Sequence, residues 1–136
     1  MGWVARQEGP RRLSQGLLLP ISAGPQVATL SFDRLGSAGL LLIVSCDIPA
    51  WLSLYVSDAA ALADASRPQS VDPDPAAGVV LDVVFTEQSA VLRLPPGVSW
   101  ANQDDPLVPV LHGLLRTDQS QPIEAMLSIS SLLLAL

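Results

Sequence analysis

The sequence predicts an antiparallel β-sandwich of about eight strands, jelly-roll or Greek-key-like, with one short helix near residues 58–66. Two observations carry this prediction. Prolines and glycines, 12 and 9 in 136 residues, divide the chain into short apolar segments, which is typical of all-β sandwiches and barrels. Most segments alternate apolar and polar side chains, the period of a half-buried strand. At 49% apolar residues, the chain can fill a core.

Three candidate strands open the domain, at residues 13–19, 26–34 and 39–47. Pro20 ends the first strand. The third, "GLLLIVSCD", is a continuous apolar run, so we expect a central strand that is covered on both sides. The second alternates and places one apolar set on a single face: Ala28, Leu30 and Phe32.

The fourth candidate strand, "AWLSLYVS" at 50–57, leads into the predicted helix. One of its faces is aliphatic and the other carries Trp51 and Tyr55. Ser57 or Asp58 can cap a helix that alanines favour and Pro68 terminates. The following "DPDPAAG" at 72–78 is predicted to be a loop, because a residue before proline disfavours helix.

Four further strands are predicted at 78–87, 89–97, 107–117 and 122–136. Glu87–Gln88 would form a tight hairpin turn between the first two of them. Ser130–Ser131 interrupts the alternation of the last strand and predicts a β-bulge. The order of the strands in the sheets does not follow from the pattern.

Charge and apolar run length exclude several classes of protein. The formal charge is −6, all seven cations are arginines, and no basic cluster occurs, so we expect no nucleic-acid binding. The longest apolar runs are too short to cross a bilayer, and no secretory signal opens the chain. A single cysteine, Cys46, predicts a buried thiol in a reducing compartment.

Residues 1–12 are predicted to be an N-terminal arm that precedes a single domain at 13–136. Three of the seven arginines lie in this arm. They could pair with an acidic neighbour, or the arm could be a solvated, disordered terminus.

Two segments carry a resemblance to a known group of proteins. They are "WLSLYVSDAAALADASR" followed by "DPDPAAGVVLDVV", and "LPPGVSWANQDDP". They resemble small proteins encoded among the tail genes of tailed bacteriophages, including phages of cyanobacteria, over roughly residues 30–130. The resemblance implies a virion component of the tail, in the baseplate or fibre-attachment region, that is made in the host cytoplasm.

A carbohydrate site is one possible use of the aromatic residues. Glycan sites pair exposed aromatic rings with Asp or Asn side chains that hold sugar hydroxyls. Alternatively, the aromatics pack against the helix and the loop after the sixth strand carries turn-forming residues. The candidate contacts to a glycan or a partner are Trp51, Tyr55, Trp100, Asn102, Asp104 and Asp105.

Metal binding and catalysis have weak support in the sequence. Asp72 with Asp74, or Asp104 with Asp105, could bind calcium, but neither segment has the alternating oxygen donors and turn glycine of a calcium loop. His112 is the only histidine and is predicted to be structural. No serine elbow, phosphate loop or dinucleotide fingerprint occurs, so we expect no enzyme and no cofactor.

Assembly is the better-supported function. High aliphatic content, few charges and the apolar end "SSLLLAL" predict a surface that other subunits cover. We therefore expect a structural or adaptor subunit of a phage tail, whose partners are copies of itself and other tail proteins. The alternative is a carbohydrate-recognition module at a fibre tip. The expected assembly contacts are Trp3, Arg6, Arg11, Arg12, Leu132, Leu133, Leu134 and Leu136.

Overall fold

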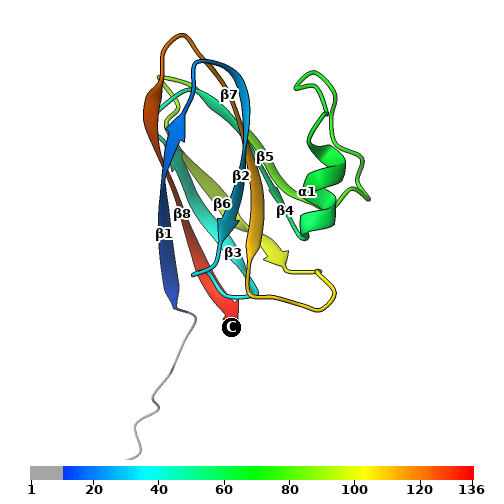
Figure 1. Ribbon diagram of the computed structural model, residues 1–136. Coiled ribbons are helices and arrows are strands. Elements are labelled where there is room, and N and C mark those ends of the chain that lie inside the picture. Colours follow the sequence, from blue (N-terminus) through cyan, green and yellow to red (C-terminus); the bar gives the residue numbers. More distant parts are fainter. Residues whose placement is uncertain (1–10) are drawn as a thin grey trace, which may run out of the picture.

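The computed structural model describes residues 11–136 and shows two antiparallel sheets packed face to face (Figure 1). The eight strands and the helix lie close to their predicted positions. The elements are β1 (Arg12–Ile21), β2 (Gly24–Phe32), β3 (Ala38–Cys46), β4 (Ala50–Tyr55), α1 (Asp58–Asp64), β5 (Val79–Phe85), β6 (Val91–Ala101), β7 (Leu111–Gln119) and β8 (Ile123–Ala135).

The order of the strands defines the sandwich as a jelly roll. One sheet has the order β1-β8-β3-β6 and the other β2-β7-β4-β5. Nearly every connection crosses from one sheet to the other, and only β4 and β5 follow each other within a sheet. This is the double-sheet arrangement of eight strands that the segment pattern predicts.

The core lies between the two sheets and is almost entirely aliphatic. It contains Leu30 and Phe32 of the predicted apolar face of the second strand, with Ala28 packed against them, and Cys46, which is buried as expected. Burial raises the pKa of the Cys46 thiol, which keeps it in the neutral form. The largest fully buried side chains include Phe32, Phe85, Leu52, Leu54 and Leu115.

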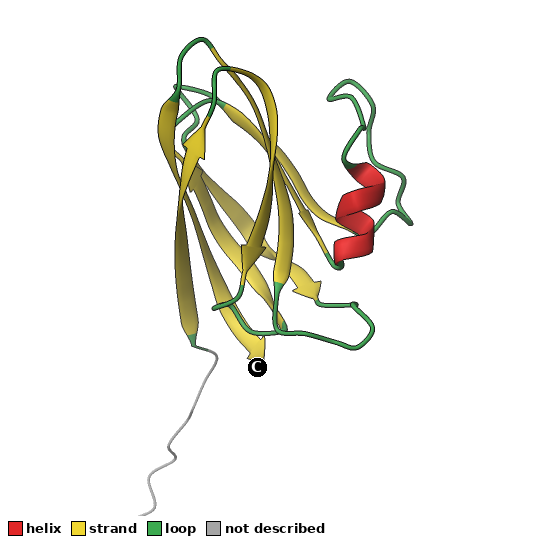
Figure 2. Ribbon diagram, in the orientation of Figure 1, coloured by secondary structure: helices red, strands yellow, loops and turns green. Residues whose placement is uncertain are grey.

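The helix α1 lies outside the sandwich, against the sheet that contains β4 and β5 (Figure 2). Ser57 caps it as predicted, since its side chain accepts a hydrogen bond from the amide of Ala60 at 3.1 Å. Ala61 is buried against Tyr55 and Leu114 of the sheet. This packing stabilises a helix of seven residues, which is too short to form alone.

Four local predictions need correction. Pro20 does not end the first strand, because β1 continues through it to Ile21. The turn at Glu87–Gln88 is tight, with Thr86 and Ser89 exchanging backbone hydrogen bonds, but β5 and β6 belong to different sheets and form no hairpin. The irregularity near Ser130–Ser131 arises from an extra residue in the partner strand β3, between Leu41 and Ile43. The strand β3 is central in its sheet, but only one of its faces is buried.

The predicted arm lies largely outside the described residues. Trp3 and Arg6 belong to that part of the chain. Arg11 and Arg12 are described, and Arg12 is the first residue of β1 rather than part of an arm, because it pairs with Leu132 of β8. No helix of residues 11–136 is long and apolar enough to span a membrane.

Candidate functional site

The aromatic face of β4 lies beneath α1 and is closed to solvent. Trp51, Ser53 and Tyr55 alternate on the side of the strand that faces away from the core. Trp51 is 7% exposed, and Ser53 and Tyr55 are fully buried. Of the predicted aromatic contacts, Tyr55 packs against the helix.

Asp82 on β5 accepts hydrogen bonds from the polar groups of this face. Its Oδ1 atom accepts hydrogen bonds from the indole Nε1 of Trp51 and from the hydroxyl of Ser53, both at 2.6 Å. Arg67, just after α1, contributes a third bond from Nη2 at 3.1 Å. Because Ser53 and Asp82 are cross-strand partners, the pairing of β4 with β5 itself creates this contact.

Asp64, at the end of α1, is the second carboxylate that binds several of these side chains. Arg67 binds it in two places, with Nε at 2.8 Å and Nη2 at 3.1 Å, and the hydroxyl of Tyr55 donates to it at 2.5 Å. Arg116 on β7 donates to the backbone oxygen of Asp64 at 2.7 Å. Such bidentate arginine–carboxylate geometry fixes orientation as well as supplying energy.

Two guanidinium groups also lie against the indole ring of Trp51. The carbon between the guanidinium nitrogens is 3.8 Å from the ring centroid in Arg116 and 5.0 Å in Arg67. Both distances are in the range of cation–π contacts. The side chains of Arg116 and Arg67 are about nine-tenths buried, so the contacts are shielded from water. We call these seven residues the α1 network: Trp51, Ser53, Tyr55, Asp64, Arg67, Asp82 and Arg116.

The pKa values in the α1 network reflect competition between burial and pairing. Burial is the largest influence and acts to raise the pKa of Asp64 and of Asp82. The hydrogen bonds from Arg67 and from the other donors, together with the nearby arginine charge, outweigh it, so both pKa values are lowered. Burial and the bond to Asp64 raise the pKa of Tyr55. The carboxylates are therefore charged and the phenol neutral at pH 7, which is the state of a structural network and not of a poised acid or base.

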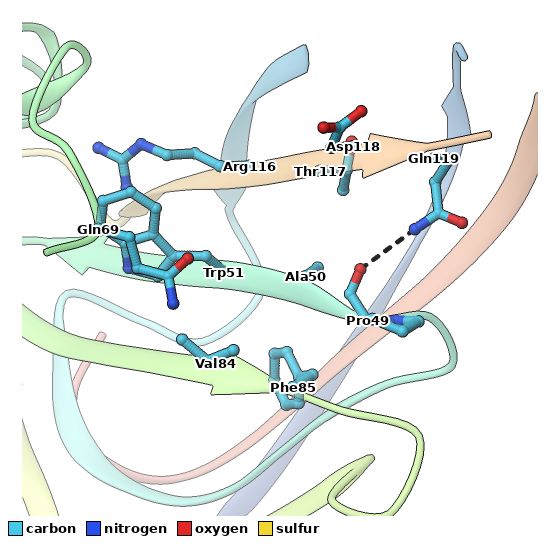
Figure 3. A pocket seen from close by; sticks show the side chains of 10 residues that line it. All are labelled: Pro49, Ala50, Trp51, Gln69, Val84, Phe85, Arg116, Thr117, Asp118 and Gln119. Carbon is cyan, nitrogen blue, oxygen red and sulfur yellow. Dashed lines mark hydrogen bonds between the residues drawn. The ribbon is translucent and has the colours of Figure 1, made fainter. Parts of the chain in front are cut away.

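An open groove of about 350 Å³ borders the α1 network on the outer side of its sheet (Figure 3). Trp51, Gln69 and Arg116 line one end, and Asp118 and Gln119 line the other. Trp51 contributes to the wall but is almost fully covered. A glycan therefore finds no free ring face of Trp51 on which to stack.

The predicted recognition loop after β6 is folded inward around Asn102. Its side-chain oxygen accepts bonds from the amides of Asp104 at 3.0 Å and Val108 at 3.1 Å. Its side-chain nitrogen donates to Asp104 and to the backbone oxygen of Val110, each at 2.8 Å. Asn102 is buried, so its role in the described structure is to shape the loop.

Asp104 connects this loop to the helix and to β7. One carboxylate oxygen accepts from the amide of Asp58 at 2.9 Å, and the other lies 2.6 Å from Nε2 of His112. Burial acts to raise the pKa of Asp104, but these partners outweigh it and the pKa is lowered. His112 thus links β7 to this loop.

The other two predicted contacts do not join these residues. Trp100 is buried in the core, and its indole nitrogen donates to the hydroxyl of Ser131 at 3.2 Å. Asp105 is exposed in the loop and makes no hydrogen bond that the described residues show. The three predicted aromatic rings therefore do not form one exposed surface.

The outer face of the sheet β1-β8-β3-β6 is not covered by α1, which packs on the other sheet. We call it the open face. Its side chains are mostly small or aliphatic, and the strands bring three charged residues to it, namely Arg12, Arg93 and Glu124. Its apolar and small members include Ser14, Gly16, Leu18, Pro20, Leu40, Ile43, Ser45, Val91, Ser99, Met126, Ser128, Ser130, Leu132 and Leu134.

The predicted C-terminal assembly contacts lie at one end of this face. Leu132 and Leu133 are partly exposed, and Leu134 and Leu136 are exposed. Arg11 and Arg12 are exposed beside them, since Arg12 pairs with Leu132. The structure therefore places Arg11 and Arg12, predicted contacts near the N-terminus, beside the predicted contacts at the C-terminus.

Sequence reasoning missed the α1 network and the groove beside it. The sequence does not indicate that Arg116 and Arg67 share a site, because they are distant from each other in the chain. Within residues 11–136, no group of three or more His, Cys, Asp or Glu side chains is placed to hold a metal ion.

Comparison with known proteins adds no relative: no family model, no curated protein and no solved structure matches the chain.

Proposed function

We propose that this chain is a structural subunit that works by assembling with other proteins, and that the open face is its main contact surface. The main support for this proposal is the contrast between the outer faces of the two sheets. The outer side of β4, β5 and β7 is largely covered by α1 and the side chains of the α1 network, whereas the open face exposes Leu18, Met126 and Leu134. Contiguous exposed apolar surface is typical of interaction sites.

The composition of the open face also favours a protein partner. Arg12 and Glu124 lie at opposite ends of the β1–β8 pair, so the middle of these two strands is uncharged. A nucleic acid would need a basic surface, which this face and the net charge of −6 do not provide. A sheet face with small and aliphatic side chains allows another sheet or an extended segment to pack against it.

The assembly that we propose is the tail of a phage virion, in the baseplate or fibre-attachment region. This part of the proposal rests on the resemblance of the segments at 51–67, 72–84 and 94–106. The jelly roll is compatible with it, since viral capsid domains use this fold, but the same fold also serves lectins and enzymes.

The carbohydrate-recognition alternative loses its supporting residues. Trp51, Tyr55 and Trp100 are buried, and Asn102 and Asp104 are bonded within their own loop. A sugar would need exposed rings and unpaired polar groups at one place. No observation in the described structure favours this function over assembly.

A matched pair of lysine substitutions tests the proposed surface. Met126→Lys places a charge on the open face, and Val27→Lys places one on the outer side of β2; the native side chains are 42% and 49% exposed. Both variants should unfold at nearly the wild-type temperature. We expect Met126→Lys to be depleted from purified particles and Val27→Lys to be incorporated normally, as measured by quantitative mass spectrometry. Normal incorporation of Met126→Lys would contradict the proposed surface.

A further inference from the structure

The outer edge of β1 is a long main-chain edge without a partner in the described structure. The strand has ten residues and pairs with β8 alone. Charged or proline-containing edges resist pairing with other chains. The opposite edge of the same sheet, β6, carries Arg93, Pro95 and a bulge near its middle. The edge strand β1 has no charge between Arg12 and Ile21, and its one proline, Pro20, lies next to its last residue.

One hydrogen bond reveals which groups of β1 point outward. The amide of Leu133 donates to the backbone oxygen of Arg11 at 2.7 Å. Because bonded pairs alternate along an antiparallel ladder, the odd-numbered residues of β1 bond to β8 and the even-numbered residues point their backbone groups away from it. Pro20, which has no amide hydrogen, lies at an even position, where its lack of a donor costs the β1–β8 ladder nothing.

We propose that a second copy of this chain adds its own β1 antiparallel to this edge, so that the two sheets become one continuous sheet around a two-fold axis at Gly16. In this register Ser14 faces Leu18 of the second copy, and Arg12 faces Pro20. The outward amides and carbonyls of Ser14, Gly16 and Leu18 all gain partners. A two-fold interface is self-complementary, as antiparallel pairing of one strand with itself requires.

The charges at the two ends of β1 match this register. Within one chain, Arg12 pairs with Leu132 and Glu124 pairs with Pro20, so the two charges are about 27 Å apart along the strands. In the proposed dimer, Arg12 of one copy lies opposite Pro20 of the other, two strands or about 10 Å from Glu124. The side chains of Arg12 and Glu124 are exposed on the same face and are long enough to meet across Pro20.

The inference rests on the proposed function, since it names a partner for an assembling subunit, but it uses a different surface. The open face is a side-chain surface, and the β1 edge is a main-chain surface. Strand addition at a free edge takes its affinity mainly from main-chain hydrogen bonds. A substitution at Met126 can therefore fail to alter the dimer and still alter incorporation into a particle.

Amide hydrogen exchange of the full-length protein, measured by NMR at a series of protein concentrations, tests the proposal. The amides of Leu13, Gln15 and Leu17 bond to β8 and should be protected at every concentration. Those of Ser14, Gly16 and Leu18 should exchange rapidly when dilute and about tenfold more slowly when nine-tenths of the chains are dimeric.

Two results would overturn the dimer. Rapid exchange of Ser14, Gly16 and Leu18 at every concentration would show that the edge stays free. Slow exchange independent of concentration would show that residues of the same chain cover it. In either case the Met126→Lys and Val27→Lys comparison still decides the proposed function separately.

A charge exchange tests the register. Arg12→Glu places like charges together at both symmetric positions and should weaken the dimer about threefold to thirtyfold at low salt, as measured by sedimentation equilibrium. The double variant Arg12→Glu with Glu124→Arg restores opposite charges and should recover the wild-type dissociation constant. A double variant as weak as Arg12→Glu alone would overturn the Gly16-centred register.

Discussion

Arg116 lies against Trp51, with its guanidinium carbon 3.8 Å from the centroid of the indole ring. The two residues are cross-strand partners on β7 and β4, so the sheet register brings them together. Arg116 also donates to the hydroxyl of Ser53 at 3.0 Å and to the backbone of Asp64 at 2.7 Å. One side chain thus joins β7, β4 and the end of α1, and fixes the helix on the sheet.

Replacing Arg116 should therefore destabilise the whole domain. Arg116→Leu removes the donors to Ser53 and Asp64 and the cation over Trp51, and we expect it to lower the free energy of unfolding by about 2–4 kcal/mol. Arg34→Leu is the control, since Arg34 is exposed in the turn after β2. Urea denaturation measures both variants, and equal small effects would contradict the role of Arg116.

The α1 network should also make stability depend on pH in the acid range. The pKa values of Asp64 and Asp82 are lowered in the folded chain, so their contribution is present above the ordinary carboxyl pKa. It is lost as the pH falls from about 4 through the lowered values. Asp82→Asn should therefore cost stability at pH 7, and the cost should shrink as the pH falls below about 4 and Asp82 becomes protonated. Thermal unfolding across this range measures the difference, and a constant cost would contradict the account.

Asn102 should be the most sensitive residue of its loop. Asn102→Ala removes four hydrogen bonds that join the loop to Asp104, Val108 and Val110, and we expect a loss of about 2–3 kcal/mol. Gln103→Ala is a neighbouring control, because Gln103 is exposed and its bond to Val56 uses its backbone amide. If urea denaturation gives the same stability for both variants, Asn102 does not organise the loop.

Gly39 should resist substitution because β3, β8 and β6 approach closely around it. A Cβ atom there would lie 2.5 Å from the hydroxyl of Ser131 and 2.6 Å from the backbone oxygen of Leu132. We expect Gly39→Ala to lower the free energy of unfolding by about 1–3 kcal/mol. At Gly16 the nearest atom is the flexible thioether of Met126 at 3.2 Å, so Gly16→Ala should unfold close to wild type. Equal melting temperatures for the two variants would contradict this packing.

The strands and the helix could be predicted because their signals are local. Alternation along 50–57 places Leu52 and Leu54 in the core, and Ser57 caps the helix that follows. The hairpin at Glu87–Gln88 was wrong because a tight turn does not reveal whether the chain stays in one sheet or crosses to the other. That choice depends on the packing of the whole sandwich.

The α1 network could not be predicted for the same reason. Asp82, Arg116 and Trp51 meet because β5, β4 and β7 are neighbours in one sheet, and strand order does not follow from periodicity. The sequence identifies the aromatic face of β4 but does not show whether this face is exposed. Its burial depends on Arg67 and Asp64, because they hold α1 and its following loop over Trp51.

The central proposal, assembly into a virion tail, is tested most directly by a mass-spectrometric inventory of phage particles purified from a culture that produces this chain. The proposal predicts that peptides of the chain persist through purification in a fixed ratio to other tail proteins. If the chain is absent from intact particles and remains in the unassembled fraction as a monomer, the proposal is contradicted.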